Sequence, residues 1–357
     1  MSRQTLHAAV IGAGAIGLNH IKGFQQHPRV KVAAVADTSA ERAQAACEKF
    51  GVPEAVADYR DLLRRQDIAL VSIALPNYLH ARVGVEALAA GKHVLMEKPF
   101  ATCARDAARV VREARRRRRV LMVGQNQRFA PLAQTLKQVV AEGKLGEVYY
   151  AEGLWMRRSG IPRIGSWFTR RELAGGGCMY DIGVHMLDLT LHLIGDFEAA
   201  AVSGQTYNKL GCRGLGNGGW GSSEIDPGAP FDVEDLAVAL IKMRSGRTVL
   251  LRTSWAAHMP ETNRMNVKLF GTEAGATLSP AQIYRPGGKD YRIEELKPRR
   301  PQVCPERMVH FVDCVLGKAK PYVPPAESLA VQRILDAVYR SAATGREVRL
   351  AAARGGR

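Results

Sequence analysis

A glycine-rich turn near the N-terminus places the strongest constraint on the fold of this chain. The segment VIGAGAIG puts Gly12, Gly14 and Gly17 in G-x-G-x-x-G spacing, after an apolar run and before a helical pattern. In a dinucleotide-binding strand–turn–helix unit, such glycines permit a tight turn and let a pyrophosphate approach the backbone. Asp37 ends the next expected strand, twenty residues after Gly17, where a carboxylate suits the adenosine ribose. We therefore predict a nicotinamide dinucleotide site here.

The residues around this turn also bear on the choice between NAD and NADP. The carboxylate of Asp37 would repel a 2′-phosphate and so favours NAD, whereas Ser39 and Arg42 lie close enough in sequence to accommodate a phosphate. We predict NAD, and NADP stays open. The cofactor-binding residues predicted in this segment are Gly12, Gly14, Ala15, Ile16, Gly17 and Asp37.

Sequence patterns along the chain indicate two domains and an α/β fold. Up to residue 125, short apolar runs alternate with amphipathic helical segments, which is typical of a doubly wound parallel sheet covered on both faces. From residue 126 the pattern changes to strands joined by tight turns, with a few helices, and this predicts an α+β domain. The glycine-rich loop Gly211–Pro230 suits a lid or an oligomer contact, and the sequence does not decide between them.

Composition and charge exclude several classes of protein. The net charge of +17 is spread along the chain, since residues 1–125 hold 20 Lys and Arg against 11 Asp and Glu, and residues 126–357 hold 31 against 23. Because the charge excess is not gathered into a tail or arm and no nucleic-acid motif accompanies it, it favours a small anionic ligand over nucleic acid. No apolar run reaches the roughly 18 residues of a membrane span, and no signal peptide is recognisable. Six cysteines without a CxxC pair predict no metal site, and we expect a cytoplasmic protein.

Three later strand ends carry polar residues where a Rossmann sheet places its ligand. The segments ALPNYLH, MEKPF and GQNQRF contribute Pro76, Asn77, His80, Glu97, Lys98 and Arg128. Some have simpler explanations, since Pro76 ends a strand and Asn77 begins a helix. Lys98 follows a buried strand and precedes a proline that fixes the chain, so a surface cation is the weaker interpretation. A lysine held there beside a cationic nicotinamide ring suits acid–base work.

A second motif, AGGGCMYDIGVHMLDL, places two acids around a histidine. Asp181, His185 and Asp188 fall at i, i+4 and i+7, which predicts one face of a helix. Oxidising a secondary alcohol requires removal of a hydroxyl proton as hydride leaves the same carbon, and histidine can accept that proton near neutral pH. We predict His185 as the base, Asp181 as its partner and Asp188 as a support. The alternative is an amphipathic helix with a merely buried histidine.

Together these motifs resemble the Gfo/Idh/MocA family, the relatives of glucose–fructose oxidoreductase and inositol dehydrogenase. The shared elements, in order, are G-x-G-x-x-G, P-N-x-x-H, E-K-P, R-F and G-G-G-x-x-x-D-x-G-x-H-x-x-D, spread over nearly the whole chain. The resemblance implies a Rossmann domain at residues 1–125. It also implies an α+β domain at residues 126–357, with a large open, mostly antiparallel sheet that often mediates dimers or tetramers. The implied reaction is oxidation or reduction of a hydroxyl or ketone on a sugar, cyclitol or sugar derivative.

Carried over position by position, the resemblance implies a catalytic set and an extended cofactor set. The catalytic set is Lys98, Asp181 and His185; the cofactor set adds Pro76, Asn77, His80, Glu97, Lys98 and Arg128. A glycosidase or epimerase that retains its NAD stays open, as does a non-catalytic dinucleotide sensor, although an intact catalytic set argues against the sensor. Aromatic and arginine residues between Trp155 and Arg170 suit either a pocket for an acidic sugar or an oligomer surface.

Overall fold

The protein, in a computed structural model that describes residues 5–220 and 223–352, folds into two compact units. The first unit comprises the chain up to Gly124 together with Val303–Leu329. The second comprises Gln125–Trp220, Glu224–Gln302 and the chain from Ala330 onward. The N-terminal residues 1–4, residues 221–222 of the glycine-rich loop and the basic tail at 353–357 lie outside the described residues.

A six-stranded parallel sheet with the order β3-β2-β1-β4-β5-β6 forms the first unit. Its strands are β1 (Leu6–Ile11), β2 (Val30–Ala36), β3 (Glu54–Val56), β4 (Ile68–Ile73), β5 (His93–Met96) and β6 (Leu121–Val123). Every pairing between them is parallel. The central strands are almost continuously buried, as expected for a sheet covered on both faces. This confirms the predicted doubly wound sheet.

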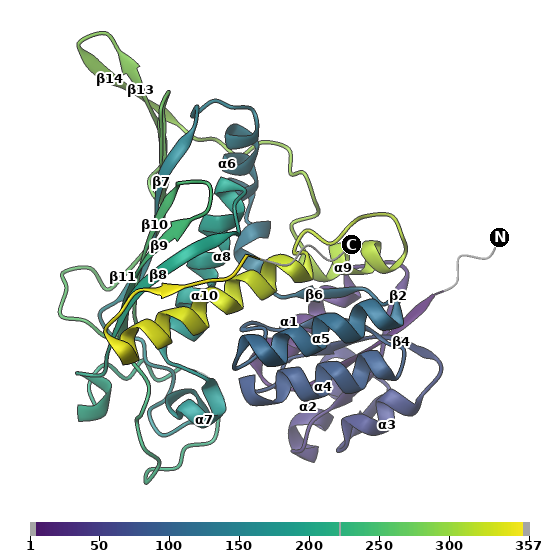
Figure 1. Ribbon diagram of the computed structural model, residues 1–357. Coiled ribbons are helices and arrows are strands. Elements are labelled where there is room, and N and C mark those ends of the chain that lie inside the picture. The colour runs from purple at the N-terminus through teal and green to yellow at the C-terminus, as the bar shows by residue number, and fades with distance from the viewer. Residues whose placement is uncertain (1–4, 221–222, 353–357) are drawn as a thin grey trace. The chain divides into compact units, whose positions relative to one another are not determined.

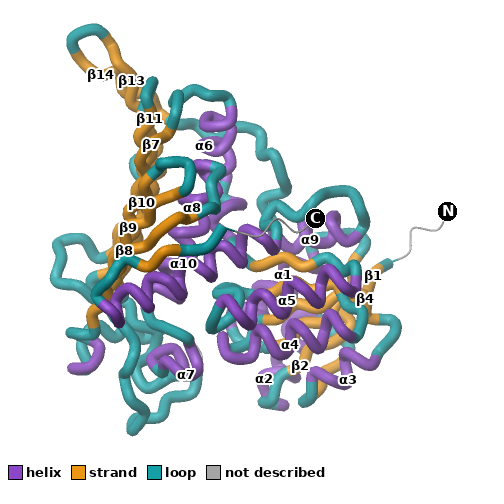
Figure 2. The backbone as a smooth tube through the Cα atoms, in the orientation of Figure 1, coloured by secondary structure: helices purple, strands orange, loops and turns teal. Residues whose placement is uncertain are grey.

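Helices of the first unit follow the strands in turn, as Figures 1 and 2 show. They are α1 (Ala15–Gln25), α2 (Ala40–Phe50), α3 (Tyr59–Arg64), α4 (Asn77–Ala89), α5 (Ala104–Arg117) and, from the C-terminal segment, α9 (Arg307–Val315). Helix α1 contacts α2 and α9, whereas α4 contacts α5. Right-handed crossovers on either side of β1 and β4 place the two groups on opposite faces of the sheet. The arginine run falls in the last turn of α5, where cations suit the helix dipole.

The second unit contains a nine-stranded sheet with the order β14-β13-β12-β11-β7-β10-β9-β8-β15. Its strands are β7 (Val148–Arg157), β8 (Ala199–Tyr207), β9 (Leu236–Met243), β10 (Thr248–Ser254), β11 (Asn263–Gly271), β12 (Gly275–Leu278), β13 (Ala281–Gly287), β14 (Asp290–Glu295) and β15 (Val348–Arg349). Neighbouring strands pair antiparallel, except that β7 and β10 are parallel. The predicted large, mostly antiparallel sheet is confirmed.

Helices α6 (Pro131–Ala141), α8 (Val184–Ile194) and α10 (Pro325–Thr344) lie along one face of this sheet, with α10 counted here from Ala330 (Figures 1 and 2). Shorter elements are η1 (Asn126–Phe129), η2 (Trp167–Thr169), α7 (Arg171–Ala174), the π-helical turn η3 (Met179–Gly183) and η4 (Gly211–Arg213). All residues of α8 are buried. A Cβ at Gly153 of β7 would touch Thr190 of α8, so Trp155 and Arg157, at alternate positions, share that face of the strand.

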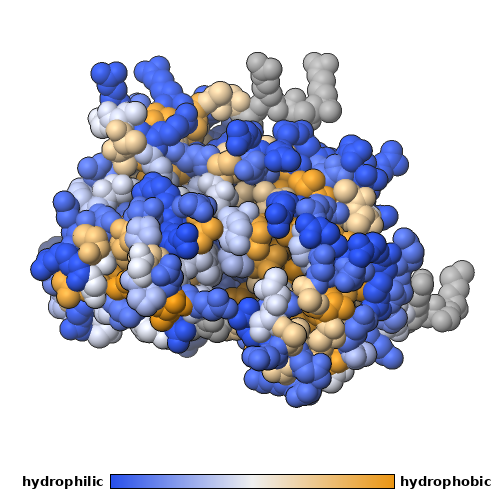
Figure 3. All heavy atoms as spheres, turned by 90° about the horizontal axis from the view of Figure 1, so that it is seen from below, coloured by the Kyte–Doolittle hydropathy of each residue, from blue (hydrophilic) through white to orange (hydrophobic). Residues whose placement is uncertain are grey.

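Hydrophilic and hydrophobic side chains are interspersed on the molecular surface. The face drawn in Figure 3 is largely hydrophilic, and hydrophobic side chains show between the polar ones. Scattered exposed apolar residues of this kind are ordinary for a folded protein. Among the described residues, no helix has the length and hydropathy needed to cross a membrane.

Candidate active site

The glycine turn of the first unit is built as the motif predicts. Gly12 has a φ of +101°, and a Cβ there would lie 2.3 Å from the Ala74 carbonyl oxygen. A Cβ at Gly17 would lie 1.8 Å from the Gly12 carbonyl oxygen, so only glycine lets α1 start this close to β1. Ala15 and Ile16 are exposed in the first turn of α1. The N–H groups of such a turn have no partners within the helix and suit a phosphate.

Asp37 reaches back to this turn. One carboxylate oxygen accepts the Ala13 N–H at 2.8 Å, and the other accepts the Ser39 N–H at 2.9 Å. That second oxygen also bonds the guanidinium of Arg42, at 2.9 Å from Nη2 and 3.2 Å from Nε. Asp37 therefore shapes the turn and holds a half-exposed arginine next to the predicted ribose site. The carboxylate of Asp37, which favours NAD, and the guanidinium of Arg42, which could accommodate the phosphate of NADP, are therefore bonded to each other.

Replacing Asp37 by alanine is expected to weaken NADH binding at least tenfold, equivalent to about 1.4 kcal/mol. NADPH should lose less, because the substitution also removes a charge that repels its 2′-phosphate. Titration calorimetry with both nucleotides measures the two dissociation constants. Asp58→Ala, which removes the acid at the N-cap of α3 in the same unit, is the matched control. Equal weakening of NADH and NADPH would remove Asp37 from ribose recognition.

His80 ties two of the predicted strand ends together. Its Nδ1 lies 2.7 Å from the Pro99 carbonyl oxygen and its Nε2 lies 2.8 Å from the Leu75 carbonyl oxygen. The ring is completely buried, and burial lowers its pKa. Pro76 directly precedes α4, and Asn77 is the buried first residue of that helix. The structure thus gives His80 a positioning role, and contact of these three residues with a dinucleotide stays a prediction.

Glu97 is held in a buried polar cluster directly before Lys98. Its Oε1 lies 2.9 Å from His20 Nε2 and 2.8 Å from Arg307 Nη2. Arg307 Nη1 donates to the Gly124 carbonyl oxygen at 2.7 Å, and His20 Nδ1 bonds the hydroxyl of Ser72. Burial raises the pKa of Glu97, but the charge of Arg307 and the bond to His20 outweigh it, so the pKa is lowered and the carboxylate stays ionised. The sequence did not indicate His20 or Arg307.

Lys98 follows this cluster at the carboxyl end of β5. Its backbone N–H donates to Oε2 of Glu97 at 3.2 Å, and a cis peptide bond joins it to Pro99. Glu97 and His80 therefore fix the backbone on both sides of the lysine, through its own N–H and through the Pro99 carbonyl. The first unit brings the predicted residues His80, Glu97 and Lys98 together at the carboxyl ends of β4 and β5.

In the second unit, Asp181 and His185 lie on consecutive turns that are not both α-helical. Asp181 belongs to the π-helical turn η3, and His185 to the first turn of α8. The sequence predicted that Asp181 and His185 lie at i and i+4 of one continuous α-helix. Their relative orientation differs from that prediction, because a π-helical turn holds more residues than an α-helical one. Short π segments inside helices occur frequently at functional sites. Both side chains are largely buried, with exposed fractions of 6% and 8%.

Glu234 fixes the start of this helical segment, and no sequence pattern indicated this role. One carboxylate oxygen accepts the N–H groups of Gly177 and Met179, at 3.0 and 2.9 Å, and the hydroxyl of Tyr339 at 2.6 Å. A Cβ at Gly177 would lie 2.0 Å from the Glu234 carbonyl oxygen, and one at Gly176 2.0 Å from the Tyr339 hydroxyl. The glycines at positions 176 and 177 therefore make room for Tyr339 and Glu234.

Two tryptophans flank the acid and the histidine. Trp255, fully buried, donates its Nε1–H to Oδ2 of Asp181 at 2.9 Å. The Trp155 ring lies 5.9 Å from the His185 ring, centroid to centroid, and its Nε1–H donates to Asn263. Arg157 stacks on Trp155 at 4.8 Å. Trp155 and Arg157, which the sequence left between a sugar pocket and an oligomer surface, thus lie on the same side as the predicted base.

Arg128 and Asp188 form a completely buried ion pair on the other side of α8. Arg128 Nε and Nη2 donate to the two carboxylate oxygens at 2.7 and 2.6 Å, and Nη1 lies 3.2 Å from Nδ1 of His192. Burial, with help from the Arg128 charge, lowers the pKa of His192 to about 2. Asp188 therefore anchors the helix to η1, in line with the supporting role expected for it. Binding of a dinucleotide by Arg128 stays a prediction.

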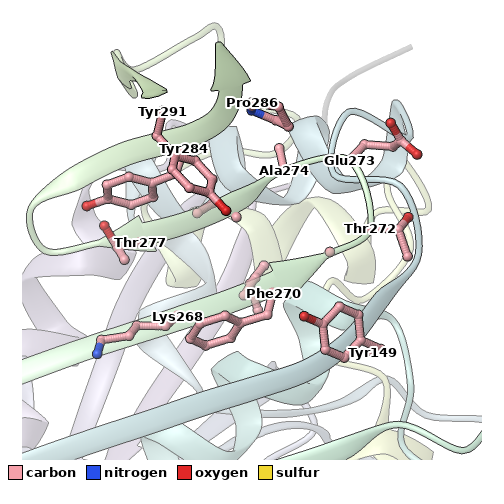
Figure 4. Close-up of a pocket in the computed structure, with 14 residues that line it drawn as sticks. Tyr149, Lys268, Phe270, Thr272, Glu273, Ala274, Thr277, Tyr284, Pro286 and Tyr291 are labelled. Carbon is pink, nitrogen blue, oxygen red and sulfur yellow. The ribbon is translucent and has the colours of Figure 1, made fainter. Parts of the chain in front are cut away.

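A separate pocket of about 530 Å³ opens elsewhere on the second unit, and Figure 4 shows its lining. Its walls come from the start of β7 and from β11 to β14, and include Tyr149, Lys268, Phe270, Glu273, Thr277, Tyr284 and Tyr291. None of the predicted catalytic or cofactor residues lines it. This pocket belongs to the far end of the sheet and has no part in the site of Asp181 and His185.

Comparisons with known proteins agree with this arrangement. Residues 6–125 match the model of the oxidoreductase family with an NAD-binding Rossmann fold, and residues 133–277 match a Gfo/Idh/MocA C-terminal domain. D-glucoside 3-dehydrogenase of Escherichia coli is 33% identical over 98% of this chain and 99% of its own. Levoglucosan dehydrogenase of Pseudarthrobacter phenanthrenivorans is 28% identical over 77% of this chain and 74% of its own. A solved structure of levoglucosan dehydrogenase with NADH and levoglucosan has the same fold, with a TM-score of 0.83 at 22% identity, covering 97% of this chain and 99% of that one. The chain belongs to the Gfo/Idh/MocA family of NAD-binding oxidoreductases.

Proposed function

We propose that the protein oxidises a secondary hydroxyl of a sugar, cyclitol or sugar derivative with NAD, and reduces the matching ketone in the reverse direction. The observation that carries this proposal is that Asp181 and His185 lie on consecutive, largely buried turns, with Trp255 bonded to the carboxylate and Trp155 near the imidazole. A buried carboxylate next to an imidazole is a suitable acid–base pair for a hydroxyl proton. Membership of an NAD-binding oxidoreductase family supplies the reaction class.

The residues of the first unit fit a dinucleotide. The glycine turn and the exposed first turn of α1 offer backbone N–H groups that suit a pyrophosphate, and for Asp37, which bonds this turn, we propose contact with a ribose. A bound NAD would supply the hydride acceptor, C4 of its nicotinamide ring. NAD is the cofactor we propose, and Arg42 leaves room for NADP.

Each catalytic residue has a role that its surroundings support. His185 takes the hydroxyl proton during oxidation and returns it during reduction. Asp181, held by Trp255, orients the imidazole and stabilises its protonated form. For Lys98, whose backbone is fixed by Glu97 and Pro99, we propose a hydrogen bond to the reacting oxygen.

A substrate screen tests this proposal directly. The name of the Escherichia coli relative makes D-glucosides the first compounds, followed by levoglucosan, inositols and hexuronic acids. Absorbance at 340 nm should rise with NAD and at least one of these classes. Glycoside cleavage or epimerisation without that rise would instead identify an enzyme that retains its NAD. Tight NADH binding without turnover of any class would contradict the proposal.

The open face of the nine-stranded sheet supports a homo-oligomer. Side chains opposite to α8 form a mixed apolar and charged surface that includes Tyr150, Glu152, Leu240, Leu250, Arg252, Lys268 and Phe270. The rings of Tyr150 and Phe270 lie 5.1 Å apart, centroid to centroid, and Leu240 is 39% exposed. Apolar surface of this kind on a sheet suits a second copy of the chain as a partner. Sedimentation of the intact protein as a monomer at micromolar concentration would contradict this. The cytoplasm is the compartment we infer, in keeping with six free cysteines.

A further inference from the structure

The side chain of Arg157 is fixed on several sides within the second unit. Its guanidinium lies 4.8 Å from the Trp155 ring centroid and 5.8 Å from that of Trp220. A Cβ at Gly160 would lie 2.5 Å from Cδ of the arginine, so the glycine makes room for the arginine stem. Its backbone exchanges hydrogen bonds with the hydroxyl of Ser254. This side chain has therefore lost much of its conformational freedom before any ligand arrives.

Among the described residues, no carboxylate lies close to the guanidinium of Arg157. In the part of the chain that the structure describes, its one hydrogen-bond acceptor is the Gly160 carbonyl oxygen, at 3.5 Å, and no carboxylate lies within 4 Å. Burial lowers the pKa of Arg157, and the more distant charge of Asp181 only partly opposes this. Stacking on the aromatic rings covers the flat faces of a guanidinium and leaves its N–H groups, which lie in the plane, for an acceptor.

The position of Arg157 relates it to the predicted base. Trp155 is the shared neighbour, since it lies against both the His185 ring and the guanidinium. The negative charge of Asp181 also acts on Arg157 and raises its pKa, against the effect of burial. The stacked arginine therefore borders the acid–base pair, and it is the kind of group that binds a carboxylate through two parallel hydrogen bonds.

We propose that Arg157 is a specificity residue that binds the carboxylate of a sugar acid while a hydroxyl of the same sugar meets His185. This inference rests on the proposed function and narrows its substrate class to sugars that carry a carboxylate. A neutral sugar leaves the stacked guanidinium without a counter-charge. The carboxylate of a hexuronate supplies that charge and two oxygen acceptors, which can lie in the plane of the guanidinium N–H groups.

The test compares two substrates that differ only at one carbon, methyl β-D-glucuronide and methyl β-D-glucoside, with NAD and the full-length protein. We expect kcat/KM for the glucuronide to exceed that for the glucoside at least tenfold. Arg157→Gln should lower the glucuronide value about a hundredfold and the glucoside value less than threefold. Arg157→Lys keeps the charge but loses the paired N–H groups of the guanidinium. Its kcat/KM for the glucuronide should lie between the wild-type and Arg157→Gln values. Arg158→Gln, at the exposed residue that directly follows β7, should change neither.

Two results would overturn the inference and leave the proposed function intact. One is a wild-type preference for the glucoside. The other is an equal loss on both substrates in Arg157→Gln, which would mean that the arginine acts through Asp181. Thermal unfolding of each variant shows whether a loss of activity reflects loss of fold. No NADH formation with these or any other sugar class, despite NADH binding, would overturn the proposed function and this inference with it.

Discussion

His185→Ala is expected to lower kcat for sugar oxidation by about a thousandfold, within the range of roughly 10²–10⁴ for loss of a general base. NADH affinity should change less than twofold, because the glycine turn and Asp37 lie in a different unit from this histidine. The loss arises because no other group then accepts the hydroxyl proton as hydride leaves. Steady-state kinetics at saturating NAD measure the effect, and fluorescence titration measures NADH binding.

His258→Ala is the matched control, since His258 is an exposed histidine of the same unit. It should retain full activity. A kcat for His185→Ala within tenfold of the wild-type value would show that the histidine is a buried packing residue, which is the simpler interpretation of the same helix. Lys98→Ala gives an independent check from the first unit, where we again expect retained NADH binding and a large loss of turnover.

The parts of the site that depend on local geometry were predictable from the sequence. Gly12 and Gly17 follow a strand and open a helix within eight residues, and their steric reason is local: a Cβ at either would collide with neighbouring backbone. The alternation of apolar runs with amphipathic segments likewise indicated the parallel sheet, because each strand and its covering helix leave a periodic pattern. The periodic pattern of apolar residues is thus enough to predict where a strand ends and which residues lie at that end.

The residues that hold the site in place were not predictable in this way. Arg307 reaches Glu97 across 210 positions, and Glu234 reaches Gly177 across 57. Such pairs leave no period or spacing in one sequence, since each partner alone looks like an ordinary charged residue. The π turn at Asp181 was missed for a related reason, because its spacing fits an α-helix equally well. Spacing therefore indicated the candidate reacting groups, and tertiary pairing determines how they are held.

Arg307→Met is expected to destabilise the first unit by about 3–5 kcal/mol, the usual cost of leaving one member of a buried ion pair without its partner. Glu97 would keep its bond to buried His20 but lose the guanidinium that compensates its charge. The carboxylate then either stays charged without that compensation or takes up a proton. Urea unfolding followed by circular dichroism measures the free energy of unfolding of each variant at pH 7.

The pH dependence of this effect has a definite sign. Glu97 has a lowered pKa in the folded protein, so its stabilising contribution is complete above the pKa of the unfolded chain, near 4.5, and is lost as the pH falls toward the folded value. The stability difference between wild type and Arg307→Met should therefore be largest at pH 7 and shrink below about pH 4.5. Arg307→Met combined with Glu97→Gln should recover part of the loss at pH 7, because no buried charge is then left without its partner. A double variant whose loss equals the sum of the two single losses, or a difference that is constant from pH 7 to pH 4, would mean that Arg307 stabilises α9 by packing and leaves the ionisation of Glu97 unaffected.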